Sequence, residues 1–144
     1  MLTNQDIVIR LLLALLASAL VGLEREKTKH PAGLRTHMLV CVASTLVTLT
    51  SIQMYPEDPT RIASGIITGI GFLGAGTIFR DRNHVRGLTT AASLWSVAGV
   101  GLALGAGAYF MAIMATAIML FILRLGMISG STKKRKGGKE VKKK

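Results

Sequence analysis

Two long stretches of this chain contain no Asp, Glu, Lys or Arg: residues 62–79 and residues 88–123. Each stretch is long enough for at least one helix that crosses the hydrocarbon core of a bilayer, which is about 30 Å thick. A water-soluble domain has no need for such stretches, and half of the 144 residues are hydrophobic. The sequence therefore predicts an all-α integral membrane protein.

Short polar breakers, several with Gly or Pro, divide the apolar sequence into five segments. These segments cover residues 7–23, 37–54, 62–79, 88–104 and 107–123. We therefore expect a bundle of five transmembrane helices over residues 1–126. Residues 127–144 are expected to form a basic, disordered cytoplasmic tail that is attracted to anionic lipid.

The orientation follows from the basic residues, because short loops rich in Lys and Arg stay on the cytoplasmic side during insertion. Of the eighteen Lys and Arg residues, all but Arg10 and Arg61 fall on one side of the predicted bundle. This places the amino terminus outside and the carboxyl terminus in the cytoplasm. Arg10 lies near the outer end of the first segment, where we expect it to reach the interface or pair with Asp6.

Nucleic acid is a poor partner for this chain despite its formal net charge of +11. Residues 133–144 hold eight Lys or Arg against one Glu, a net +7 that is confined to the tail. Aromatic residues make up only 5% of the chain, so a basic surface on which bases stack is not expected.

The best candidate functional site is a polar cluster at the predicted cytoplasmic ends of the helices. Opposite charges and hydroxyl groups from several segments meet at this interface, where hydroxyls can bond to a backbone carbonyl or to another helix. The cluster comprises Glu24, Arg25, Glu26, Arg35, Arg80, Arg86, Thr89, Thr90 and Ser93.

The third apolar segment is rich in glycine, which predicts close packing against several neighbours and a central position in the bundle. Its glycines are Gly65, Gly69, Gly71, Gly74 and Gly76. The alternative is a broken helix whose backbone is exposed to a ligand, as in some transporters. We favour packing over this functional interpretation.

Metal binding and catalysis have little support in the sequence. Glu57 and Asp58 are weak candidates for a ring that holds hydrated Mg²⁺ in an oligomer. The histidines at 30, 37 and 84 lack the spacing of a metal motif, and Cys41, the single cysteine, is expected to pack in an apolar run. No nucleophile elbow or phosphate-binding loop can be assigned, so we expect no enzyme activity and no cofactor.

Five ordered motifs resemble the MgtC/SapB family of bacterial inner-membrane proteins over about residues 7–125. They lie at residues 20–26, 31–37, 58–63, 69–76 and 85–95. The resemblance implies a five-helix membrane domain, a role in adaptation to magnesium limitation and, in pathogens, in survival inside host cells. It also implies that the protein regulates other membrane machines, such as the proton-translocating ATP synthase.

Two departures from the family pattern limit this transfer. Pathogen-type members carry a soluble carboxyl-terminal domain where this chain has its short basic tail, and Thr89 stands where those members have an Asn that is important for function. Our leading hypothesis is a non-enzymatic regulator that docks against another membrane protein complex and also associates with itself. The alternative is a transporter or channel for Mg²⁺ or another small solute.

Overall fold

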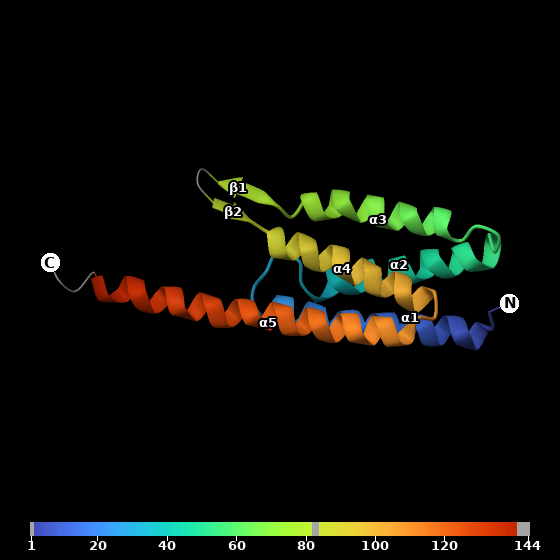
Figure 1. The fold of residues 1–144 in the computed structure, drawn as a ribbon, viewed down its shortest axis with the longest axis horizontal. Helices are drawn as coiled ribbons and strands as arrows, with labels where there is room; N and C mark the ends of the chain where they lie inside the picture. The colour runs from blue at the N-terminus through green and yellow to red at the C-terminus, as the bar shows by residue number, and fades with distance from the viewer. Residues whose placement is uncertain (1, 82–83, 141–144) are drawn as a thin grey trace.

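Five helices and one short β-hairpin form the described part of the chain (Figure 1). The helices are α1 (Asn4–Lys27), α2 (Leu34–Met54), α3 (Thr60–Ala75), α4 (Leu88–Gly105) and α5 (Tyr109–Glu140). The hairpin pairs β1 (Phe79–Asp81) with β2 (His84–Arg86) in antiparallel register. This computed structural model describes residues 2–81 and 84–140, with side chains for residues 2–80 and 84–125.

Each of the five predicted apolar segments overlaps one helix. By length and composition, α1, α2 and α4 are able to cross a membrane, whereas α3 and the apolar part of α5, Tyr109–Leu125, are shorter. The backbone of α5 continues as a helix to Glu140. The predicted basic tail at residues 127–144 lies outside the residues whose side chains are described.

The outer surface of the bundle is apolar, which is the reverse of a soluble protein. Large side chains such as Leu16 of α1, Phe72 of α3 and Phe110 of α5 are exposed by more than half of their area. In contrast, many serine and threonine side chains are buried between the helices. Lipid around the molecule accounts for both features, because an apolar surface is stable in hydrocarbon and hydroxyl groups there need an internal partner.

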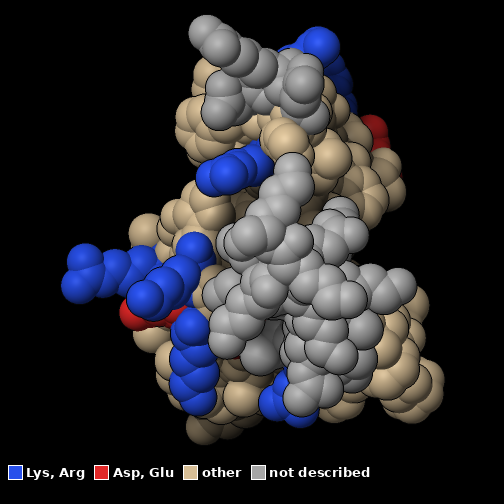
Figure 2. All heavy atoms as spheres, turned by 90° about the vertical axis from the view of Figure 1, so that its left-hand side faces the viewer, with Lys and Arg blue, Asp and Glu red and all other residues tan. Residues whose placement is uncertain are grey.

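Lysine and arginine side chains gather at one end of the bundle, which we call the basic end and define by Lys27, Lys29, Arg35, Arg86 and Arg124. The loop after α1 and the β-hairpin both lie there, as Figure 1 shows. Figure 2 looks onto this end and shows Lys and Arg around its rim. The amino terminus and the turns α2–α3 and α4–α5 lie at the opposite end (Figure 1).

Helix α4, not α3, occupies the centre of the bundle. It contacts all four other helices, whereas α3 lies at the edge against α2 and α4 (Figure 1). The prediction that the glycine-rich third segment is central was therefore wrong. Its glycines Gly65, Gly69 and Gly71 have nothing within 4 Å of the position that a Cβ would take.

Helices α2 and α4 approach each other closely, and two glycines of α4 permit it. A Cβ on Gly101 would lie 2.8 Å from the Cβ of Ser44, and one on Gly105 would lie 2.6 Å from the Cβ of Thr48. Both distances are too short for real side chains, so only glycine allows this approach. Hydroxyl groups of α2 then reach the backbone of α4, because Ser44 donates to the Ala98 carbonyl at 2.7 Å. The Thr45 hydroxyl lies 2.9 Å from the Gly101 carbonyl of α4 and 2.9 Å from the Cys41 carbonyl of its own helix, so these two acceptors share its proton.

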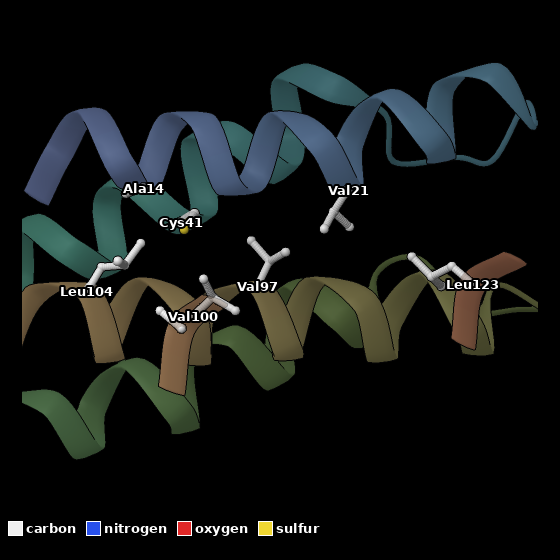
Figure 3. Close-up of a cluster of buried hydrophobic side chains, with 8 residues drawn as sticks. Ala14, Val21, Cys41, Val97, Val100, Leu104 and Leu123 are labelled. Atoms are coloured by element: carbon white, nitrogen blue, oxygen red, sulfur yellow. The ribbon is translucent and has the colours of Figure 1, made fainter. Parts of the chain in front are cut away.

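Apolar side chains fill the remaining space between α1, α2, α4 and α5 (Figure 3). Val97, Val100 and Leu104 of α4 point towards Ala14 and Val21 of α1, as Figure 3 shows. Cys41 of α2 is buried in the same cluster, in agreement with the predicted packing role. The core thus connects four helices and leaves α3 outside.

The β-hairpin corrects the prediction of a purely helical fold. Residues 76–79 were expected to continue the third helix, but α3 ends at Ala75 and β1 begins at Phe79. Gly87 ends the hairpin in the left-handed region, with φ +90°, and a Cβ there would overlap the carbonyl of Thr77. Glycine at this position therefore allows the chain to return directly into α4.

Hydrogen bonds of Arg10 connect α1 to the turn between α4 and α5. Its Nη1 donates to the Gly105 carbonyl at 2.6 Å and its Nε to the Tyr109 hydroxyl at 3.2 Å, while its guanidinium lies 5.9 Å from the centre of the Tyr109 ring. A cation at the last carbonyls of a helix also interacts favourably with the helix dipole. Asp6 instead forms a capping box with Thr3 at the start of α1.

Candidate functional site

The predicted polar cluster lies at the basic end, where the last turn of α1 meets the first turns of α2 and α4. Gly22 brings α1 and α2 together there, because a Cβ on it would lie 2.7 Å from the Cα of Leu34 and 3.3 Å from the Cβ of His37. The cluster residues separate into a buried group between these helices and an exposed group on the rim.

Arg25 and Glu24 form a buried ion pair at the end of α1. Arg25 is only 2% exposed, and its Nη2 donates to Glu24 Oε1 at 2.9 Å while its Nε donates to the other carboxylate oxygen. Two parallel bonds of this kind pair the guanidinium with a carboxylate of opposite charge, as a buried charge requires. The pair therefore places a strong dipole, with no net charge, beside α2.

Glu26, which was predicted as part of the same cluster, has a separate structural role. Its Oε2 accepts the backbone N–H of Leu34 at 2.8 Å, and Gly33 packs directly against the carboxylate. A carboxylate at the start of a helix satisfies a free amide and interacts favourably with the helix dipole. Glu26 therefore caps α2 from the end of α1.

His37 connects α2 to α4 inside the cluster. This side chain is fully buried, its Nε2 lies 3.0 Å from the Ser93 hydroxyl, and its Nδ1 lies 2.9 Å from the Gly33 carbonyl. Because a carbonyl only accepts, Nδ1 carries a proton, and in a neutral ring Nε2 accepts from Ser93. The charged groups Arg25 and Glu24 lie near enough to act on this ring.

The hydroxyl of Ser93 has a second acceptor within reach, the carbonyl of Thr90 at 2.8 Å. Its single proton can be given to this carbonyl or to His37, but not to both at once. Thr90 itself is 1% exposed, and among the described residues its Oγ1 has no hydrogen-bond partner. A buried hydroxyl without a partner lowers the stability of the folded protein, so Thr90 is a destabilising position in the cluster.

Sequence reasoning considered His37 only as a metal ligand and missed its position in the cluster. The sequence offered no signal for it, because the Gly33 carbonyl that His37 Nδ1 approaches already accepts the backbone N–H of His37 in the first turn of α2. The other predicted members, Arg35, Arg80, Arg86 and Thr89, are exposed on the rim of the basic end. The structure thus brings Glu24, Arg25, Thr90 and Ser93 into one buried group with His37 and leaves the other five predicted residues, Glu26 among them, outside it.

The weak metal candidates Glu57 and Asp58 lie at the opposite end of the bundle. Both are exposed in the turn between α2 and α3, and they line a surface hollow of about 790 Å³ with Tyr55 and Arg61. Asp58 also accepts a hydrogen bond from the Thr60 hydroxyl at 2.7 Å. No group of three or more His, Cys, Asp or Glu side chains that can hold a metal occurs among the described residues.

The glycines of α3 differ in their surroundings. Gly74 contacts Ala91 of α4 at ordinary distances, since a Cβ on Gly74 would lie 3.6 Å from the alanine Cβ, and Gly76 faces only carbonyls of its own helix. Gly65, Gly69 and Gly71 border open space. Within the described part of this chain nothing packs against these three glycines, so the prediction that they pack closely now concerns contact with a second molecule.

Comparison with known proteins identifies the family. A family model described as the MgtC family matches residues 11–128. The chain is 47% identical over 113 residues to Protein MgtC of Salmonella typhimurium, a match that covers 78% of this chain and 49% of that protein. It is 42% identical over 127 residues to an uncharacterized protein of Haemophilus influenzae, covering 81% of this chain and 53% of the relative.

A third relative carries a functional name. The Escherichia coli K12 protein named "Putative magnesium transporter YhiD" is 36% identical over 129 residues, covering 83% of this chain and 60% of the relative. This chain thus spans about half the length of the curated relatives that it matches. No solved structure matches it. From the family model and these identities, the chain belongs to the MgtC family.

Proposed function

We propose that this protein is a multi-pass protein of the bacterial inner membrane that regulates another membrane protein complex during adaptation to magnesium limitation. In this proposal α3 docks against a transmembrane helix of that complex. The supporting observation is the open face of α3, where Gly65 and Gly69 lie one turn apart with nothing within 4 Å of a Cβ position. Small residues with this spacing allow two helix backbones to approach closely in a membrane.

All five helices cross the membrane in this proposal, and the basic end faces the cytoplasm. The charge distribution supports this orientation, since basic loops are retained on the cytoplasmic side. The sixteen residues of α3 extend over about 24 Å, somewhat less than a hydrocarbon core of about 30 Å. Local thinning of the bilayer or association with a partner accommodates such a short helix.

The interface between α2 and α4 supports regulation rather than transport. The hydroxyls of Ser44 and Thr45 donate to backbone carbonyls across this interface, and Thr48 donates to Ser44 within α2. The bonds of Ser44 and Thr45 serve to hold the two helices together. A path for a dehydrated cation needs polar groups that are free to replace its water.

Photo-crosslinking in native membranes tests the docking surface. A photoreactive amino acid at Gly65 is expected to crosslink to a second membrane protein, whereas the same amino acid at Ala92, exposed on α4, is expected to give little product. Gly65→Leu with Gly69→Leu should abolish this product and the growth advantage in low magnesium. Crosslinks only between copies of this chain, or equal products from both positions, would contradict the proposal.

Transport of Mg²⁺ or another small solute is the second candidate function. It is favoured by the hollow at the opposite end, which Glu57 and Asp58 line, and by the name of the Escherichia coli relative. Carboxylates attract a hydrated divalent cation that keeps several of its waters. Flux into liposomes that contain the purified protein, lost in Asp58→Ala or Thr89→Ala, would favour transport over the regulatory proposal.

A further inference from the structure

A groove runs along the outside of the bundle between α1 and α5. Its apolar part has a volume of about 320 Å³ and is lined by residues such as Leu13, Ala17 and Ala117, with Leu104 of α4 among its walls. Thr116 also lines this part, but its hydroxyl group donates to the Ala112 carbonyl at 2.7 Å. The groove therefore presents an apolar surface to its occupant.

Towards the basic end, the groove continues into a second, polar hollow of about 340 Å³. The two hollows share Leu20 and Leu120 in their linings, and the second is also lined by Glu24, Lys27 and Arg124. Glu24 is engaged by Arg25, so the charges left to act on an occupant are those of Lys27 and Arg124. Both side chains are exposed.

Among the described residues, the opposite end of the groove offers no comparable cation. Tyr109 lines the groove there, and the guanidinium of Arg10 already binds the Gly105 carbonyl and the tyrosine hydroxyl. The groove is thus apolar along most of its length and positively charged at one end only. An occupant that matches it has one long apolar chain and one anionic head.

From these features we infer that the α1–α5 groove binds an anionic phospholipid. An acyl chain lies in the apolar part, and Lys27 and Arg124 bind the phosphate. From Leu13 to Lys27 the groove extends along about 21 Å of α1, which exceeds the roughly 15 Å of hydrocarbon in one leaflet. The groove lies away from the proposed docking face of α3 and does not depend on the proposed function.

The experiment measures which lipid stays bound to the full chain. The protein is purified from nanodiscs of phosphatidylcholine that contain phosphatidylglycerol, and the retained lipid is counted by native mass spectrometry. Phosphatidylglycerol is expected to be retained over phosphatidylcholine, and Lys27→Gln with Arg124→Gln is expected to weaken its retention by about tenfold or more, since each basic residue near a membrane surface contributes to anionic lipid binding.

Two matched controls distinguish lipid binding in the groove from the general effects of surface charge and of added side-chain volume. Lys29→Gln with Arg35→Gln removes two charges of the same end outside the groove and should leave retention unchanged. Ala117→Phe fills the groove and should release the lipid, whereas Ala92→Phe, at an exposed position of α4, should not.

The inference is overturned if phosphatidylcholine is retained equally, or if the Lys29 and Arg35 substitutions cause the same loss as those of Lys27 and Arg124. It is also overturned if Ala117→Phe leaves retention unchanged, if inorganic phosphate displaces the lipid, or if a helix of another protein crosslinks into the groove. The comparison of the two lipids on the unmodified protein keeps the test decisive even where a variant fails to fold.

Discussion

His37 Nε2 lies 3.0 Å from Ser93 Oγ, which joins the first turn of α2 to the first turns of α4 within the buried part of the bundle. The other ring nitrogen is 2.9 Å from the Gly33 carbonyl, so one side chain connects a helix start to a neighbouring helix. The charge pair of Glu24 and Arg25 lies near enough to act on the ring. This connection is the most specific feature of the candidate site and the first to test.

We expect His37→Ala to lower the free energy of unfolding by about 2 kcal/mol or more, because it leaves a cavity and removes both hydrogen bonds of the imidazole ring. Urea unfolding in detergent, followed by circular dichroism, measures this loss. His84→Ala is the control, since His84 is exposed on β2 and should change stability little. Equal losses in both variants would show that the hydrogen bonds of His37 are unimportant.

Thr90 and Ser93 give a pair of substitutions with opposite expected signs. Thr90→Val replaces a buried hydroxyl that has no partner among the described residues with a methyl group of similar size, so stability should stay equal or rise by about 1 kcal/mol. Ser93→Ala removes the partner of His37 and should lower stability by about 1 kcal/mol.

Thr90→Val also separates a structural role of Thr90 from a functional one. If Thr90→Val is stable but fails to support growth in low magnesium, the unpaired hydroxyl serves a ligand or partner at the cost of stability. If it supports growth as well as the unmodified protein, Thr90 has no functional role in the cluster.

Gly101 and Gly99 are two glycines of α4 with opposite surroundings. Gly101→Ala should lower the free energy of unfolding by about 1–3 kcal/mol, because the new methyl group would overlap Ser44 and the Cys41 carbonyl. Gly99 has nothing within 4 Å of a Cβ position, so Gly99→Ala should be neutral or stabilise the helix by up to about 1 kcal/mol. Thermal unfolding in detergent distinguishes them, and similar melting temperatures would contradict the close approach of α2 and α4.

Arg10 and Tyr109 are suited to a double-mutant cycle. Arg10→Ala should destabilise the protein by about 1–3 kcal/mol, since it removes a charged donor from the end of α4. Tyr109→Phe keeps the ring beneath the guanidinium but removes the hydroxyl, so its cost should be about 0.5–1 kcal/mol. A coupling energy near zero, from unfolding of both single variants and the double variant, would show that the two residues act independently.

Membrane orientation is testable by cysteine labelling in a Cys41→Ser background. Tyr55→Cys should react with an impermeant maleimide in intact spheroplasts, whereas Lys29→Cys should react only after lysis, because the basic end is proposed to face the cytoplasm. Both positions are exposed, so access to the reagent depends on their side of the membrane. Labelling of Lys29→Cys in intact spheroplasts would invert the proposed orientation.

The five helices were predictable because the spacing of charges along the chain reflects the length of each apolar segment. The hairpin was not, since Ile78 and Phe79 continue an apolar run, and the need for glycine at position 87 arises only from the nearby Thr77 carbonyl. The sequence also did not predict which helix is central. Glycine content favoured α3, but close approach requires a neighbour, and the glycines that have one are Gly22, Gly101 and Gly105.

The candidate site was predictable in its location but not in its membership. Opposite charges near the helix ends indicated the polar cluster, and the pairing of Glu24 with Arg25 requires no long-range contact. Burial, however, depends on how the helices rotate about their axes, which places Thr90 inside and its neighbour Thr89 outside. His37 was missed because its partner Ser93 is 56 positions away in the sequence.

The hydrogen bonds from Ser44 and Thr45 to α4 end on main-chain carbonyls, those of Ala98 and Gly101. No substitution at the accepting positions deletes the acceptor, whatever residue replaces the alanine. Substitution can therefore remove the hydrogen bond only from the α2 side. On α4 the tolerated residues are limited by side-chain size, whereas on α2 they are limited by the need for a hydroxyl group.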